Sequence, residues 1–136
     1  MRTDWFVKVD CPRPRRNISS EEDENERCPN CPYVIWEKPQ KVLGFMYSMC
    51  GVRVGCIIDE EIDEIGKKVT GIEKFTKEDS NPALKRNILE KIKAYAKEND
   101  WTISCLSQRK TLEHINNLIK FCKRAQAKGL EIWVLK

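Results

Sequence analysis

Apolar residues recur at helical spacing in two long stretches of the second half of the chain. The first stretch follows Asn81-Pro82, where asparagine can cap free backbone N–H groups and proline suits the first helical turn. In the second stretch Thr111 is a candidate cap and Gly129 a stop. The spacing therefore predicts two amphipathic helices. The expected buried positions are Leu84, Ile88, Leu89, Ile92, Tyr95 and Ala96 in the first helix, and Leu112, Ile115, Leu118, Ile119, Cys122 and Ala125 in the second.

Short apolar runs predict the strands. Trp101–Leu106 and Leu130–Leu135 each follow one of the two helices. Two strands joined by a helix of this length are normally parallel and crossed right-handedly, which favours a helix–strand–helix–strand order. Upstream, three consecutive runs with short links predict an antiparallel meander, and Trp5–Val9 is a further candidate strand. The three runs of the meander are residues 42–49, 52–58 and 68–75, with the acidic run Asp59–Glu64 as a loop between the last two.

These elements predict an α/β (α+β) fold. Its mixed sheet would combine the antiparallel three-strand meander with the later helix–strand–helix–strand unit, over residues 42–136. Residues 1–41 would form a small N-terminal cysteine-rich lobe that carries the first strand. With 136 residues, 40% apolar and 34% charged, the chain has the size and composition of one globular domain with an appendage.

The predicted order of elements over residues 42–136 resembles the RNase H-like fold. Two local stretches add to the resemblance. Ser104-Cys105-Leu106-Ser107-Gln108 stands where ribonucleases H carry a Ser-x-Asp-Ser-Gln-like turn, and Glu131–Leu135 is similar to the last strand of the family. The resemblance implies a core of this family, with residues 1–41 as an addition to it.

The same resemblance implies a site that has lost its catalytic carboxylates. Members of the family hold two divalent ions with acidic side chains from the first strand, the first helix and the end of the fourth strand, because hard ions prefer carboxylate oxygens. In this sequence the corresponding positions fall on Tyr47–Met49, on Arg86 or Asn87, and on Leu106, none of which is acidic. The expectation is therefore a domain that does not cleave by that mechanism.

The net charge of +4 is unevenly distributed along the chain. Residues 80–136 hold twelve Lys and Arg against five Asp and Glu, whereas residues 42–79 hold five against eight. The basic helices are either solvated surfaces or a footprint for nucleic acid or a nucleoprotein partner. Trp36, Phe45 and Tyr47 are candidates for stacking on bases. The candidate nucleic-acid-binding residues are Arg86, Lys93, Lys97, Arg109, Lys110, Lys120, Lys123 and Arg124.

The seven cysteines include one Cys-x-x-Cys pair, Cys28 and Cys31. This spacing is typical of structural zinc sites, which need four ligands. Since the single histidine, His114, is far along the chain on a predicted exposed helix position, a zinc site would be all cysteine, with Cys11 and with Cys50 or Cys56 as the further ligands. Reduced structural thiols and redox or iron–sulfur chemistry are the alternatives.

Acidic residues suggest two further hypotheses. A metal-dependent nuclease could use a displaced set of carboxylates, Asp59, Glu60, Asp63 and Glu73, although charge runs are usually solvated. Alternatively, the acidic segments Glu21–Glu24 and Asp59–Glu64 could mimic phosphate and bind a protein partner, as in an adaptor or inhibitor of a nucleic-acid-processing machine.

The first expectation for function is a non-catalytic module that binds nucleic acid or a nucleoprotein. No apolar run approaches the roughly 20 residues of a membrane span, and no apolar stretch of a secretory signal follows Met1-Arg2. An odd number of cysteines also differs from a pure disulfide framework. Together these features predict an intracellular protein, cytoplasmic or nuclear, without a membrane partner.

Overall fold

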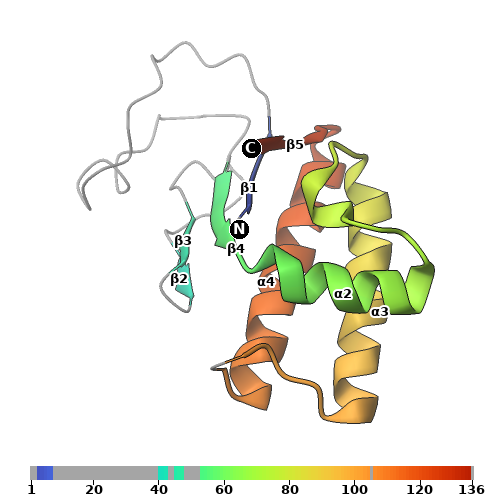
Figure 1. The fold of residues 1–136 in the computed structure, drawn as a ribbon. Helices are drawn as coiled ribbons and strands as arrows, with labels where there is room; N and C mark the ends of the chain where they lie inside the picture. The colour runs from blue at the N-terminus through green and yellow to red at the C-terminus, as the bar shows by residue number, and fades with distance from the viewer. Residues whose placement is uncertain (1–2, 8–39, 43–44, 48–52, 105, 136) are drawn as a thin grey trace.

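The computed structural model describes residues 3–7, 40–42, 45–47, 53–104 and 106–135. In these residues a sheet of short strands lies beside three α-helices (Figure 1). The strands are β1 (Thr3–Val7), β2 (Gln40–Val42), β3 (Phe45–Tyr47), β4 (Arg53–Ile57) and β5 (Ile132–Leu135). The helices are α2 (Asp59–Thr70), α3 (Pro82–Asn99) and α4 (Gln108–Ala127), with a 3₁₀ turn, η1 (Phe75–Lys77), between α2 and α3.

The sheet has the strand order β2-β3-β4-β1-β5, and all of these pairings are antiparallel. β1 lies between β4 and β5, so that Trp5 is opposite Val54 on one side and Val134 on the other. The outer edge of β5 is covered by the segment before α3. There Ser80 forms a bridge with Ile132, and the Val134 N–H donates to Asp79 Oδ1 at 2.8 Å.

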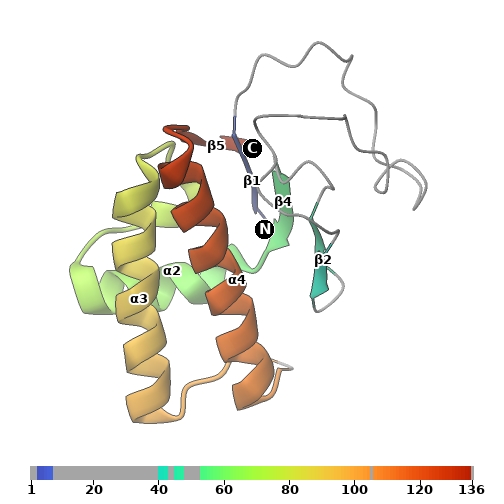
Figure 2. The same ribbon diagram turned by 180° about the vertical axis from the view of Figure 1, so that it is seen from behind.

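The three helices pack together on one side of the strands (Figure 1). α3 and α4 lie side by side and antiparallel, and α2 crosses behind them when they face the viewer (Figure 2). A hydrogen bond from Gln108 Nε2 to the carbonyl of Ala96 joins the start of α4 to the last turn of α3. The core between helices and sheet includes Trp5 and Val7 of β1, Ile57 of β4, Ile62 and Ile65 of α2, Phe75 of η1, Ile88, Leu89 and Ile92 of α3, Ile115, Leu118 and Phe121 of α4, and Ile132 of β5.

The predicted start of α3 is confirmed, whereas that of α4 is wrong. Asn81 caps α3, because its side chain accepts a hydrogen bond from the Ala83 N–H at 2.8 Å. α4 begins one turn earlier than expected, and its cap is Ser107, whose hydroxyl accepts from Lys110 N. Thr111 lies inside the helix and is buried, where its hydroxyl accepts from the Ile103 N–H at 3.0 Å.

The predicted α/β fold class is wrong, because the strand expected between the two long helices does not form. The segment from Trp101 to Ser104 is a loop, in which Ile103 is buried and its N–H bonds to a side chain rather than to a neighbouring strand. α3 and α4 therefore follow each other directly, and β5 pairs with β1 in the antiparallel direction. The predicted helix–strand–helix–strand unit and the predicted RNase H-like order of elements both require a strand between α3 and α4, so both are wrong.

The meander predicted over residues 42–75 is also wrong, because its third strand is absent. Residues 59–70, expected as an acidic loop and the start of that strand, form α2. Acids in its first turn and Lys67 and Lys68 in its last turn match the helix dipole, so the charges that suggest a loop favour a helix here. Gly71, with φ +78°, ends the helix, and η1 follows it.

Two further expectations concern boundaries and membranes. The first strand, which the sequence assigns to a lobe over residues 1–41, is paired on both sides with strands of the main domain. Residues 1–2 and 8–39 of that lobe lie outside the described residues, and its last two residues belong to β2. Among the helices in the described part of the chain, none combines the length and apolarity needed to cross a membrane.

Candidate nucleic-acid interface

Three of the predicted basic residues form a row along α3. Arg86, Lys93 and Lys97 are separated by seven and four residues, a spacing that aligns side chains on one side of a helix. The opposite side of the helix, with Ile88 and Ile92, is buried in the core. Because the helix is anchored by this buried stripe, its row of cations has a fixed position.

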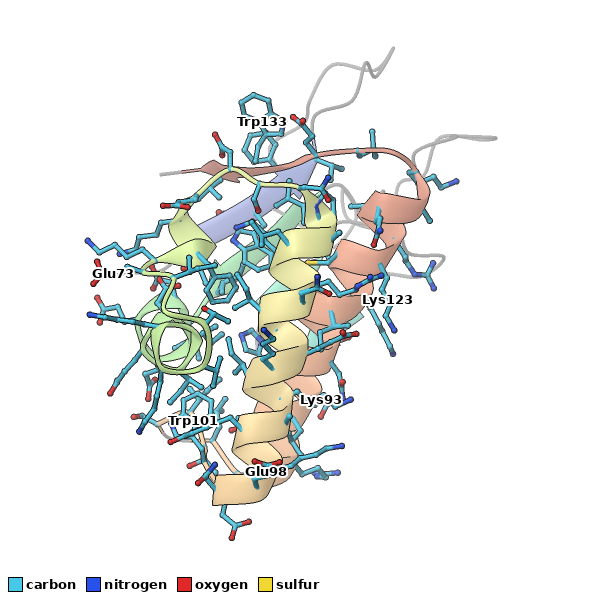
Figure 3. All side chains as sticks on the ribbon, turned by 90° about the vertical axis from the view of Figure 1, so that its right-hand side faces the viewer. Glu73, Lys93, Glu98, Trp101, Lys123 and Trp133 are labelled. Carbon is cyan, nitrogen blue, oxygen red and sulfur yellow. The ribbon has the colours of Figure 1, made fainter. Side chains whose placement is uncertain are left out.

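α4 carries a second row, formed by Arg109, Lys120 and Lys123, which are all exposed. The two rows lie on the same surface. Lys93 and Lys123 point to the same side of the helix pair (Figure 3). We call this surface the basic face and define it by Arg86, Lys93, Lys97, Arg109, Lys120 and Lys123.

The antiparallel packing brings the ends of the two rows together. The bond between Gln108 and Ala96 places Arg109 near the Lys97 end of α3. At the other end, the positive charge of Arg86 acts on the thiol of Cys122, the residue before Lys123. Two predicted residues lie elsewhere: Lys110 and Arg124 are exposed but share a line along α4 with Asn117, which is buried.

The cations of the basic face are available to an external anion. Within the described residues none of the six forms an ion pair, and the ion pairs that Lys67 makes with Glu73 (2.7 Å) and Lys77 with Asp59 (3.6 Å) lie away from this surface. Two acids, Glu90 and Glu113, share the helical lines of the rows and reduce the local positive charge.

Arg86 and Lys93 are the two partly buried cations of the basic face, whereas the other four are exposed. Arg86 differs from Lys93 in the state of its side-chain nitrogen. Its Nε is covered by protein and has no hydrogen-bond partner in the described part of the chain. Its neighbour Cys122 is fully buried, and burial raises the pKa of that thiol to about 12. The covered Nε restricts the arginine side chain before any ligand binds.

A buried cation, Lys85, precedes Arg86 and was not among the predicted site residues. Its ammonium donates to the carbonyl of Phe75 at 2.6 Å and lies 4.5 Å from the centre of the Trp5 ring and 5.8 Å from that of Phe75. Burial lowers the pKa of Lys85 to about 8. Lys85 is three and four residues before Ile88 and Leu89, which places it on the buried stripe of α3. This spacing is the sequence feature from which its burial could have been predicted.

The displaced acid set is not brought together as a metal centre. Asp63 is buried, and its two carboxylate oxygens accept from the N–H and hydroxyl of Thr76 at 3.1 and 2.6 Å. Burial raises the pKa of Asp63. Glu60 is exposed, whereas Glu73 follows the far end of α2, roughly 16 Å along the axis from Asp59 at 1.5 Å per residue. Within the described residues no three His, Cys, Asp or Glu side chains form a group suited to a metal.

The acidic segment of α2 is also only partly available for a protein partner. Asp59 and Asp63 are buried, and Glu61 accepts from both the N–H and the hydroxyl of Ser104. Glu60 and Glu64 are its exposed acids. The other proposed acidic segment, Glu21–Glu24, lies outside the described residues.

The proposed zinc ligands Cys11, Cys28, Cys31 and Cys50 also lie outside the described residues, while Cys56 is part of β4. Of the candidate stacking residues, Trp36 lies outside them too, and Phe45 and Tyr47 belong to β3, which is remote from α3 (Figure 1). His114, expected on an exposed position, is fully buried, and burial lowers its pKa to about 4.

Comparison with known proteins identifies no relative of this chain: no family model, no curated protein and no solved structure matches it.

Proposed function

We propose that this chain is a non-catalytic module that binds nucleic acid, alone or within a nucleoprotein, through the basic face of α3 and α4. The observation that carries the proposal is that six cations stand in two rows on one rigid surface, and none has an ion-pair partner in the described part of the chain. Phosphates are the anions that such rows would neutralise.

Binding of this kind is governed by counterion release. Each phosphate neutralised by Lys or Arg releases condensed counterions, so the logarithm of affinity falls with the logarithm of salt concentration by about 0.9 for each contact with duplex DNA. The buried stripe beneath the rows supports the mechanism, because cations on an ordered helix pair lose little freedom when a ligand binds.

The test compares two variants that each lose two positive charges. Lys93→Gln/Lys123→Gln removes one charge from each row, whereas Lys74→Gln/Lys91→Gln removes two exposed lysines outside the basic face. Affinity for a fluorescent oligonucleotide is measured by fluorescence anisotropy at salt concentrations between about 50 and 200 mM. Over this range each phosphate contact changes the slope of log affinity against log salt concentration by about 0.9, which is large enough to resolve. The first variant should flatten the salt slope by about 1.8, and the second should leave it close to wild type.

Two results would overturn the proposal. If both double variants weakened binding equally, net charge rather than the basic face would control the affinity. If the wild-type chain did not bind at the lowest salt concentration, no nucleic-acid function would remain for this surface.

A structural zinc stays a prediction that accompanies this function. Cys11, Cys28, Cys31 and Cys50 would hold it as four thiolates, and its contribution would be to the folding of the N-terminal part. No reaction is assigned to the metal.

A further inference from the structure

The basic face has dimensions that separate two kinds of nucleic acid. On α3, Arg86 and Lys97 are eleven residues apart, which is about 16 Å along the helix; on α4, Arg109 and Lys123 are fourteen residues apart, about 21 Å. Helices in contact have axes about 8–10 Å apart. The face therefore presents two rows of positive charge, similar in length and side by side.

The separation of these rows cannot adapt freely to a ligand. Ile88 and Ile92 of α3 and Ile115 and Leu118 of α4 are buried in one core, and the two helices are further joined where Gln108 bonds to Ala96. Close-packed interiors resist displacement. A ligand that uses both rows must therefore bring two lines of phosphates at a fixed distance.

A double helix has this property and a single strand does not. The two backbones of a duplex border grooves of set width, about 6 and 12 Å in B-form DNA. Each strand offers a phosphate about every 3.4 Å, so rows of 16–21 Å extend over roughly five or six base pairs. A single strand offers one flexible line, and it could fill both rows only by folding back at a cost in conformational entropy.

We propose that the basic face selects double-helical nucleic acid, with one phosphate backbone along the α3 row and the other along the α4 row. This inference rests on the proposed function and names its substrate class. Arg86 is the expected anchor, because its partly buried side chain has a covered Nε that restricts the guanidinium, and a guanidinium can donate two parallel hydrogen bonds to a phosphate. Recognition would follow backbone geometry rather than base sequence.

Salt dependence distinguishes a ligand on two rows from a ligand on one. The full chain is titrated into labelled duplex DNA, duplex RNA and a single DNA strand of the same length, at several salt concentrations. Six contacts with duplex DNA give a slope of about −5, which is roughly a thousandfold loss of affinity between 50 and 200 mM salt. Three contacts with a single strand give a slope of about −2, a loss of roughly twentyfold.

Row variants add an independent measurement. Arg86→Gln/Lys93→Gln/Lys97→Gln and Arg109→Gln/Lys120→Gln/Lys123→Gln each remove one row, and each should flatten the duplex slope by about 2.7. Circular dichroism checks that both variants fold, and the wild-type slopes test the inference even if one does not. Tight binding to either duplex, DNA or RNA, with the steep slope supports it.

The outcomes also separate this inference from the proposed function. Equal affinity and equal slope for duplex and single strand would overturn the selection of a double helix and leave phosphate binding intact. Absence of salt-dependent binding to all three probes would overturn both.

Discussion

The substitution Gly66→Ala tests whether the junction of α2, η1 and β1 is as tightly packed as its contacts indicate. Gly66 lies in the middle of α2 and is buried, and a Cβ placed on it would be 2.9 Å from both Cδ1 and Cε1 of Phe75 and 3.6 Å from Ile88 Cγ2. Optimal carbon–carbon contacts are about 3.5–4.0 Å. In Gly66→Ala the Phe75 ring must therefore move, or the helix must.

Two effects of opposite sign decide the result. Alanine in a helix interior is favoured over glycine by about 1 kcal/mol, whereas overpacking a core typically costs about 1–3 kcal/mol. The Phe75 ring packs edge-on against Trp5 with a centroid separation of 6.5 Å, and its carbonyl accepts from Lys85. The next residue, Thr76, is bonded to Asp63 and accepts from Trp5 Nε1 at 2.8 Å. Because neither the ring nor its backbone can move freely, we expect the clash to prevail.

The two effects together give a net loss of up to about 2 kcal/mol, which lowers the urea midpoint by up to roughly 1 M for a slope near 2 kcal/mol/M. Glu64→Ala, an exposed position in the same helix, is the control and should change stability by less than about 0.5 kcal/mol. In a Phe75→Leu background the ring is gone, so Gly66→Ala should become neutral or stabilising. If Gly66→Ala alone left the midpoint unchanged or raised it, the packing described for Phe75 would be refuted.

Three other predictions concern a buried cation, a helix cap and a metal. Because burial lowers the pKa of Lys85 from 10.5 to about 8, the unfolded state holds more protons between these values and stability should rise with pH across that window, by at most about 3 kcal/mol. Urea denaturation at pH 7.5 and 10 should show this rise in wild type and not in Lys85→Met; an equal rise in both would contradict it. Asn81→Ala removes the cap of α3 and should cost about 1 kcal/mol in thermal or urea unfolding, whereas Asn87→Ala, exposed in the same helix, should not. Metal analysis of the purified chain should find one zinc, and Cys28→Ser/Cys31→Ser should lose it together with part of the melting temperature; a melting temperature insensitive to both chelator and substitution would exclude a structural zinc.

Local signals along the chain predicted α3 and part of its surface. Asn81 and Pro82 mark its start, and the spacing of Ile88, Leu89 and Ile92 marks its buried side. The same periodicity places Arg86, Lys93 and Lys97 in one row. These features depend on neighbours within a few residues, which is why sequence alone predicts them. Leu84, expected in the core, is 48% exposed, since no element in the described part of the chain covers that side of the helix start.

The strand errors have a different origin, in contacts that are remote in sequence. Residues 101–106 have the composition of a strand, but Thr111 supplies a side-chain acceptor for the Ile103 N–H, and no described strand lies beside it. Residues 59–64 have the composition of an acidic loop. However, Ile62, Ile65 and Val69 are spaced three and four residues apart, so a helix places all three on the side that packs against the core. Strand and helix compete closely in such short segments, and tertiary packing decides.

His114 and Lys85 show a second limit, since one helix can be covered on more than one side. α4 buries not only the stripe with Ile115 and Leu118 but also a neighbouring line that includes His114 and Phe121. A prediction that assumes one buried side for the helix places such a histidine in solvent. Similarly, charge counts include Lys85 with the surface cations, although its ammonium is enclosed by Trp5 and Phe75. The basic surface of these helices therefore has fewer cations than a count of Lys and Arg implies.

The position of β1 between β4 and β5 has a consequence for the order of folding. Phe6 is paired with Trp133, so one of the contacts that complete the sheet joins segments separated by nearly the whole chain. Contacts of such high sequence separation form slowly, because loop-closure entropy opposes them until other structure has brought the segments together. During synthesis the α3–α4 hairpin can assemble from neighbouring residues, while Trp5 must wait for β5 to leave the ribosome before its second strand partner exists. We therefore expect helix formation to precede closure of the sheet, and Trp5 fluorescence to report the late step.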